Sequence, residues 1–422
     1  MVKIISNRKP GRFVYLPDEI LIDIISRVAE AQRTLVSCAL VSIQWYHVTM
    51  PFLYGHPRRL EKNQAFDQFV RTILGVGEAT TATVRRRRND LASLVRILDL
   101  SRLIHHSTNS LTAKLINAVK DGLKAFAAPS LSLTSHQGLV TLSKCIDLEF
   151  LNLSFMMRET DFPSVKKAIR RMSRLSGLVL PASLTIQDQS EMALDVEWPP
   201  NLSYLSIGLT YLANPQACAD AGFLWPSSLQ HLIISGHASF RWLLEFVTLL
   251  DPFPPFPDVS ILELIPLRTP SLRSRNIELP TGPSDNSGGA WMIIHKFPNL
   301  KSLILPSTDC NEDFMEAYCQ CQPQPLENLY LLQSDEGIHF EIETLYKAAT
   351  QGLPNLRSFW YEYNHAGVDE DVLDDYETGI WRAMTDREGR EPDDQPESGW
   401  FTIIDIPYRP RKIEHETWYE DD

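Results

Sequence analysis

The sequence predicts an α/β chain in which a short N-terminal module of three helices precedes a solenoid with a curved parallel sheet. One observation behind this prediction is a proline-initiated helix start followed by apolar stripes within the first 55 or so residues. Another is a Leu-x-x-Leu-x-Leu pattern that recurs along most of the remaining chain. The composition, 44% hydrophobic and 22% charged over 422 residues, is that of an ordinary globular protein.

The N-terminal module begins at Leu16-Pro17-Asp18-Glu19. Proline in a first helical turn needs no backbone donor, and acidic residues favour the positive end of the helix dipole, so we expect a helix to start near residue 17. Apolar residues recur with helical spacing over 20–28, a second stripe follows over 35–45, and a shorter third segment covers 48–54. So small a module has more apolar surface than its own core can bury. This surplus favours a docking face.

These residues resemble the fungal style of the F-box family, in which Leu-Pro-x-Glu-Ile-Leu is followed by Cys-x-Leu-Val-Ser-x-x-Trp and a final Leu-Tyr. The matching residues are Leu16, Pro17, Glu19, Ile20 and Leu21, then Cys38, Leu40, Val41, Ser42 and Trp45, then Leu53 and Tyr54. One departure is Ile43-Gln44, where family members often carry a basic residue before the tryptophan.

The resemblance implies docking onto the Skp-type adaptor of an SCF (cullin-RING) ubiquitin ligase, and through that adaptor to a cullin. The alternative is a plain helical cap on the solenoid. The implied adaptor-binding residues are Leu16, Pro17, Glu19, Ile20, Leu21, Ile24, Leu40, Val41, Trp45, Leu53 and Tyr54.

The repeated pattern has the period of leucine-rich repeats. Clear copies start at residues 95, 148, 175, 202, 229, 259, 300, 326 and 356, and a weaker copy is Ala128-Leu131-Leu133. From 148 to 229 the starts are 27 residues apart three times running. A strand with a returning helix or loop cannot bury its leucine row alone, so about ten such units are expected to stack into one core.

The expected organisation has five parts. They are an F-box-like module over 13–56, a helical connection over 57–93, irregular leucine-rich repeats over 94–362, an acidic segment over 363–398 and a C-terminal cap and tail over 399–422. The acidic segment holds twelve acids and three arginines between 363 and 398, a net charge of −9, so most of the chain's excess of −13 is local.

Residues that alternate with the inward leucines are expected to line the open face of the sheet. The target-binding candidates there are Asn152, Ser206, His231, Glu263, Asn328, Tyr330, Ser358, Trp360 and Glu362. Large aromatics beside polar groups are typical of binding hot spots. Tyr330 and Trp360 could equally cover the last strands near the C-terminal cap.

Two basic segments lie outside the repeat pattern. The insertion at 266–291 carries Arg268, Arg273 and Arg275, which could grip a phosphorylated or acidic motif, although solenoids also tolerate such loops without function. The run of arginines at 85–88 is either a nuclear import signal or a solvated linker.

A search for catalytic chemistry finds little. Cys310, Cys319, Cys321 and His295 invite a zinc interpretation, but Cys-x-Cys without a second pair is not a structural zinc spacing. Nucleophile elbows, Walker loops and dinucleotide fingerprints are missing from the sequence. We therefore expect neither an enzyme nor a cofactor or metal.

The expected partners are proteins. A charge of −13 argues against a nucleic-acid partner, and neither a secretory signal nor a membrane-length apolar run is evident, which favours the cytoplasm, the nucleus or both. The sequence predicts a substrate-recognition subunit of an SCF ligase with an unknown target. The alternative is a leucine-rich-repeat scaffold or interaction module that joins no ligase.

Overall fold

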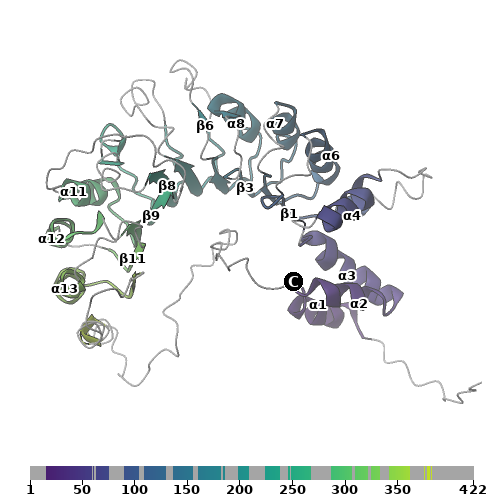
Figure 1. Ribbon diagram of the computed structural model, residues 1–422, viewed down its shortest axis with the longest axis horizontal. Helices are drawn as coiled ribbons and strands as arrows, with labels where there is room; N and C mark the ends of the chain where they lie inside the picture. The colour runs from purple at the N-terminus through teal and green to yellow at the C-terminus, as the bar shows by residue number, and fades with distance from the viewer. Residues whose placement is uncertain are drawn as a thin grey trace, which may run out of the picture. The chain divides into compact units, whose positions relative to one another are not determined.

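A computed structural model describes the chain in two compact units, residues 1–148 and 149–422 (Figure 1). The residues that the structure describes are 16–58, 60, 63–75, 90–103, 109–129, 136–154, 160–181, 184–185, 198–208, 224–237, 246–247, 249–267, 287–306, 309–321, 325–332, 342–361, 375, 378–380 and 382. Among them, no helix combines the length and the apolar character that crossing a bilayer requires.

The first unit opens with the helices α1 (Asp18–Arg27), α2 (Gln32–Ala39) and α3 (Ile43–Gly55). Helix α1 starts directly after Pro17, as the sequence predicts, with both acids in its first turn. The three helices enclose a small core, and its buried members are Leu21, Ile25, Leu35 and Val48. A module this small gains its stability from this one cluster and from what it packs against.

The predicted boundary between the second and third segments was wrong. The helical conformation breaks over residues 40–42, and α3 then runs through Pro51 to Gly55. Ser42 causes the break. Its extended backbone and its side chain, which accepts a hydrogen bond from the Trp45 amide at 3.2 Å, make it an N-cap. A serine within an apolar stripe therefore marks a helix start here.

The rest of the first unit alternates helices and strands. It contains α4 (Asn63–Leu74), β1 (Ile97–Asp99), α6 (Asn109–Val119), β2 (Ala125–Ala127) and α7 (His136–Leu142). Strands β1 and β2 are parallel, with Leu98 paired to Phe126. Helix α6 packs against α4 and α7.

The first strand is joined to the helical module by a backbone hydrogen bond. The Arg96 amide donates to the carbonyl of Gly55, the last residue of α3, at 2.9 Å. One repeat later, the amides of Lys124 and Ala125 donate to the Arg96 carbonyl in turn, at 2.7 and 3.0 Å. The end of α3 thus occupies the position that a preceding strand would occupy.

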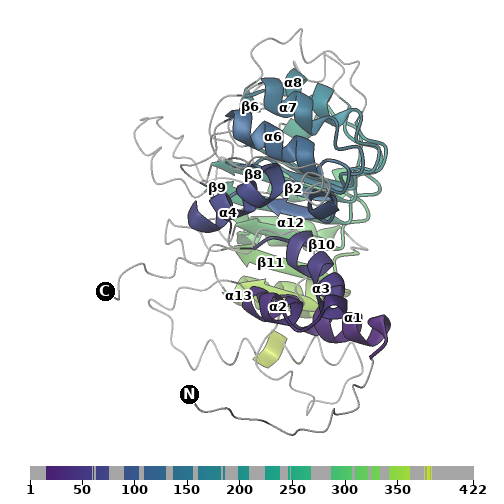
Figure 2. The ribbon, with the colours of Figure 1, turned by 90° about the vertical axis from the view of Figure 1, so that its right-hand side faces the viewer.

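The second unit is built on a parallel sheet whose strands follow one another in chain order. The strands are β3 (Phe150–Asn152), β5 (Gly177–Val179), β7 (Tyr204–Gly208), β8 (His231–His237), β9 (Ile261–Leu267), β10 (Ser302–Pro306), β11 (Asn328–Leu332) and β12 (Ser358–Tyr361). A separate two-stranded sheet pairs β4 (Thr160–Asp161) with β6 (Leu184–Thr185). Figure 2 shows β10 and β11 stacked as neighbours.

Helices return the chain between strands of the second unit. They are α8 (Phe162–Ile169), α11 (Ser287–Lys296), α12 (Glu312–Gln320) and α13 (Ile342–Lys347), the last continued by the π-helical turn η3 (Ala348–Gly352). Figure 1 shows α11, α12 and α13 in a row along one face of this sheet. Strand plus returning helix is the leucine-rich-repeat unit, as predicted.

The leucine positions of the repeats form the core. From the copy at Leu148 to that at Leu326, all three template positions are at most 4% exposed. Register keeps equivalent residues side by side, so that Leu178 pairs with Leu205 and Leu205 with Leu232. Each repeat therefore buries its leucines against those of the next.

The weak copy expected at Ala128-Leu131-Leu133 is in the wrong register. Pairing of Leu98 with Phe126 shows that this repeat reads Leu123, Phe126 and Ala128, all three buried. Ala128 therefore fills the last leucine position and not the first. An alanine and a phenylalanine in place of two leucines hid the pattern in the sequence.

Candidate interaction surfaces

Helix α1 carries exposed apolar side chains in addition to its buried ones. Ile20 is 49% exposed and Ile24 is 40% exposed, whereas Leu21 and Ile25 face the core. Pro17, Ile20 and Ile24 are spaced three and four residues apart, so they line one side of the helix. This apolar stripe faces solvent.

A second group of exposed apolar residues lies where α2 passes into α3. Leu40, Val41 and Ile43 are 82%, 63% and 79% exposed. The side-chain amide of Gln44 donates to the Leu16 carbonyl at 2.7 Å and to the Asp18 carboxylate at 2.6 Å. These bonds hold the start of α3 beside the start of α1.

The two groups together are named here the docking surface, because the Gln44 bonds bring the α2–α3 junction next to the stripe on α1. Large exposed apolar areas rimmed by polar groups mark interaction sites on soluble proteins. The docking surface consists of Pro17, Ile20, Ile24, Leu40, Val41 and Ile43.

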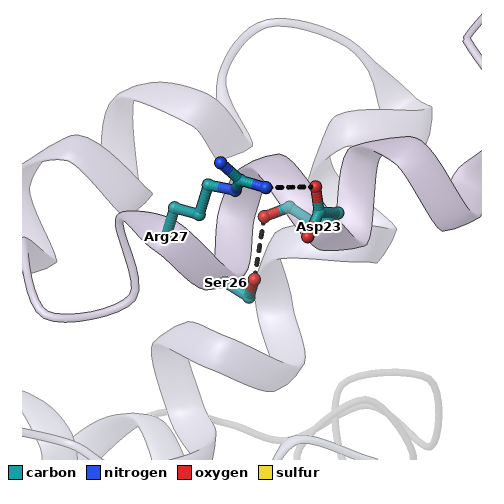
Figure 3. Close-up of polar contacts among 3 residues, drawn as sticks. All are labelled: Asp23, Ser26 and Arg27. Atoms are coloured by element: carbon teal, nitrogen blue, oxygen red, sulfur yellow. Dashed lines mark hydrogen bonds and ion pairs between the residues drawn. The ribbon is translucent and has the colours of Figure 1, made fainter.

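A polar border runs along the stripe on α1. Asp23 and Arg27 each follow a stripe residue by three positions, and their side chains form an ion pair at 3.2 Å (Figure 3). The Ser26 hydroxyl donates to the Asp23 carbonyl at 2.8 Å. Both charged side chains are mostly exposed, so the pair contributes little stability and limits how far apolar contact can extend around the helix.

The other candidate surface is the sheet face opposite the leucines in the second unit. Residues on either side of a buried central leucine point to this face. Pairing places them in two rows across the strands, one through Tyr204, His231 and Asn328, the other through Ser206, Glu263 and Tyr330.

His231 and Glu263 form the most buried polar contact of this face. The His231 Nε2 lies 2.8 Å from the Glu263 Oε1, and both side chains are almost fully buried. The His231 and Tyr204 rings are nearly perpendicular, with centroids 4.7 Å apart. The pair therefore links strands β7, β8 and β9 by side chains as well as by backbone.

Aromatic contact continues across the face to Phe150. The Phe150 and Tyr204 ring centroids are 5.8 Å apart although β5 runs between their strands. Gly177 on β5 makes this possible, because a Cβ there would lie 2.3 Å from Cδ2 of Phe150. We name the row Phe150, Tyr204 and His231 the aromatic ladder.

Comparison with known proteins identifies the helical module. Residues 13–59 match the family model described as F-box-like. The N-terminal module is F-box-like.

Two fungal F-box proteins share sequence with the chain. One is F-box protein YDR306C of Saccharomyces cerevisiae, 32% identical over 187 residues, which cover 43% of this chain and 36% of that protein. The other is F-box protein COS111 of Candida glabrata, 36% identical over 107 residues, which cover 25% of this chain and 10% of that protein. The matched parts thus span about a third and a tenth of these relatives.

A solved structure also resembles the chain. It is the leucine-rich repeat-containing protein LegL7 from Legionella pneumophila, with a TM-score of 0.39 and 17% identity, covering 70% of this chain and 91% of that one.

Within the F-box-like module, the residues that were expected to contact the adaptor differ in how deeply the structure buries them. Leu21 is fully buried and has no surface with which to contact a partner, so its expected docking role is replaced by one in the core. Leu16, Trp45 and Leu53 are partly buried and pack against that core, Tyr54 is half-buried, and Glu19 is exposed.

Sequence reasoning missed three exposed apolar residues of the F-box-like module, namely Ile22, Val36 and Ile43. Ile22 and Val36 each adjoin a buried leucine in the sequence, so the helical stripe that fills the core cannot also contain them. Ile43 was treated only as a departure from the family pattern. The signal that could have revealed these exposed residues is an apolar side chain that lies outside the main helical stripe.

The predicted target-binding residues fall into three groups. Asn152, His231 and Glu263 are buried, and Ser206, Asn328, Tyr330 and Ser358 are half-buried. The Trp360 side chain and Glu362 lie outside the described residues. Phe150 and Tyr204, which the sequence did not single out, are half-buried on the same face.

Some of these polar groups are engaged locally. The Asn152 Oδ1 accepts hydrogen bonds from the amide and the hydroxyl of Ser154, at 2.9 and 2.7 Å. The Asn328 Nδ2 donates to the Ser302 hydroxyl at 2.8 Å. Both asparagines therefore order the sheet face as well as lining it.

The cysteines considered for zinc do not gather into a ligand set. Among the described residues, no three histidine, cysteine or acidic side chains are placed to share a metal ion. Burial raises the pKa of the Cys319 thiol to about 11 and raises the pKa of Cys310 further. His295 instead contacts the ring of Trp291.

Several predicted segments fall outside the described residues. These are Arg268, Arg273 and Arg275, the arginines at 85–88, nearly all of the acidic segment, and the cap and tail at 399–422.

Proposed function

We propose that this chain is a substrate-recognition subunit of an SCF-type ubiquitin ligase. The F-box-like module docks onto a Skp-type adaptor, and through it a cullin, while the repeats bind a target protein. The observation that carries the proposal is the docking surface, six apolar residues left exposed on a module that already has its own core.

Exposure of these apolar side chains to water is energetically unfavourable. Burying one large aliphatic side chain is favourable by about 1.5–3 kcal/mol, so leaving several in water forgoes that stabilisation. A partner that covers Leu40, Val41 and Ile43 together with the stripe on α1 would recover it. The family match over residues 13–59 supports an adaptor as that partner.

The target is proposed to bind the sheet face of the second unit. Its candidate contacts remain Asn152, Ser206, His231, Glu263, Asn328, Tyr330, Ser358, Trp360 and Glu362. In this role the chain holds the target close to the other subunits, which perform the ubiquitin transfer.

The adaptor contact can be tested by substitution in the full chain. The double variant Ile20→Asp/Leu40→Asp should weaken binding to a purified Skp-type adaptor at least 100-fold, because each carboxylate would be buried unpaired in the interface. Isothermal titration calorimetry measures this change. Ile146→Asp is the matched control, since Ile146 is 58% exposed in the same unit but lies outside the docking surface.

Unchanged adaptor affinity of the double variant would contradict the proposed interface. Absence of adaptor binding by the natural chain would favour the second candidate, a repeat scaffold that joins no ligase. One observation supports that candidate, namely that the end of α3 caps the first strand through the Gly55 carbonyl. A cap role needs no adaptor.

A further inference from the structure

The side chain of Gln44 makes the polar contacts that lie between the two groups of the docking surface. Its Nε2 donates to the Leu16 carbonyl at 2.7 Å and to the Asp18 Oδ1 at 2.6 Å. A side-chain amide nitrogen carries two hydrogens, so these two bonds use its whole donor capacity. Both acceptors are oxygens, so only the nitrogen end of the amide can face them. The contact therefore depends on a donor at position 44.

The two bonds connect the beginnings of two helices. Leu16 and Asp18 lie on either side of Pro17, where α1 starts, and Gln44 lies in the first turn of α3. The bonded partners are 28 and 26 residues apart in the chain, so chain connectivity alone does not bring them together. Helix α1 has no side-chain hydrogen bond at its Pro17 cap. Gln44 thus anchors the start of a helix that lacks a side-chain cap of its own.

Exposed members of the docking surface lie directly beside these bonds. Ile43, which is 79% exposed, precedes Gln44, and Ile20, which is 49% exposed, follows Asp18 by two positions. The buried core of the module begins about one turn further along each helix, at Leu21 on α1 and at Val48 on α3. The Gln44 bonds therefore set the spacing between apolar side chains that face solvent.

From these contacts we infer that Gln44 is a positioning residue for adaptor binding. It holds the starts of α1 and α3 in the arrangement that the adaptor recognises, so that the docking surface is in place before the partner arrives. Preformed surfaces bind better, because only the fraction of molecules in the competent arrangement can associate. This inference rests on the proposed function, because it assigns a residue to the adaptor contact.

A positioning role differs from direct contact in its kinetics. If loss of the Gln44 bonds lowers the competent fraction, the association rate constant falls in proportion to that fraction. The complex, once formed, keeps its interface and dissociates at the natural rate. If Gln44 instead contacted the adaptor, its loss would raise the dissociation rate constant.

Gln44→Met in the full chain provides the test, because methionine has a similar length and no N–H donor. We expect stopped-flow measurements with a purified Skp-type adaptor to show association slowed about 5–10-fold, since two hydrogen bonds are lost and one of them has a carboxylate acceptor. Dissociation should stay within about twofold of the natural rate. Gln32→Met is the matched control, because Gln32 is half-buried in the same module but lies outside the docking surface. It should change neither rate.

Asp18→Ala removes the acceptor of one of the two bonds. It should slow association about threefold, and the double variant Gln44→Met/Asp18→Ala should associate no more slowly than Gln44→Met, because the shared bond can be lost only once. Four results would each overturn the inference: natural association by Gln44→Met, faster dissociation in its place, an equal effect of Gln32→Met, or effects that multiply in the double variant.

Hydrogen exchange in the free chain separates failure of this inference from failure of the proposed function, because it needs no adaptor. The Leu21 and Tyr46 amides donate to the Pro17 and Ser42 carbonyls and close the first turns of α1 and α3. Both amides should exchange about fivefold faster in Gln44→Met, because the helix starts open more often. Absence of adaptor binding by the natural chain would overturn the ligase role, whereas unchanged exchange in Gln44→Met would overturn the positioning role.

Discussion

The Glu263 Oε1 lies 2.8 Å from the His231 Nε2 on the sheet face of the second unit, and both side chains are almost fully buried. The two residues lie on neighbouring strands, β8 and β9. Their contact therefore joins the two strands through side chains, in addition to the backbone pairing. Buried polar groups of this kind are costly when they lose their partner.

Replacing Glu263 therefore tests the pair. Glu263→Leu should lower the free energy of unfolding by about 1–3 kcal/mol relative to Glu263→Gln, because leucine leaves the His231 ring nitrogen buried without a partner. Glutamine keeps both a donor and an acceptor at this position. Urea denaturation of the two variants gives the difference, and equal stability would show that the hydrogen bond contributes nothing.

Adjacent residues of α2 provide a second test. Leu35→Ala should cost about 2–5 kcal/mol, because Leu35 is 1% exposed and its removal leaves a cavity in the small core of the F-box-like module. Val36→Ala should change stability by less than about 0.5 kcal/mol, since Val36 is 46% exposed. Similar losses for both, measured by circular dichroism during denaturation, would contradict the assigned core.

Two glycines make a third comparison. At Gly122 a Cβ would lie 2.6 Å from the Ser93 carbonyl oxygen, so Gly122→Ala should displace the turn before β1 and cost about 1–3 kcal/mol. At Gly288, near the start of α11, an added Cβ would meet no atom within 4 Å apart from those of its chain neighbours and its own helix backbone. Gly288→Ala should therefore stabilise the chain by up to about 1 kcal/mol. Thermal unfolding of both variants checks the opposite signs.

Alkaline pH should weaken the first unit through Cys145. Burial raises the pKa of this thiol from 9.0 to about 12, so between these values the unfolded chain releases a proton that the folded chain keeps. Stability is then full below pH 9 and falls as the pH rises toward 12. Cys145→Ala should show a shallower decline over that range, and an identical pH profile would contradict the assignment.

The repeats were predictable because their pattern reports burial directly. A leucine at each template position, spaced by 27 residues, places Leu151, Leu178, Leu205 and Leu232 in one row, and the structure confirms that row. The repeat at Leu123 escaped because alanine and phenylalanine replace leucines, which changes the letters while keeping the positions apolar.

Contacts between individual side chains were harder to predict than the rows of buried leucines. Phe150, Gly177 and Tyr204 share a 27-residue spacing, yet the contact of the two rings across the glycine depends on rotamers that no pattern records. Likewise, the apolar residues of α1 form one broad stripe in the sequence, but only packing against α3 decides that Leu21 is buried and Ile20 exposed.

The hydrogen bond from Arg96 to the Gly55 carbonyl connects residues far apart in the chain but adjacent in the first unit. Because this bond joins the last residue of α3 to the residue just before β1, the helical module is fastened to the first repeat by backbone as well as by chain connectivity. A substitution that disturbs the end of α3 should therefore also disturb the first strand, and the two should unfold together.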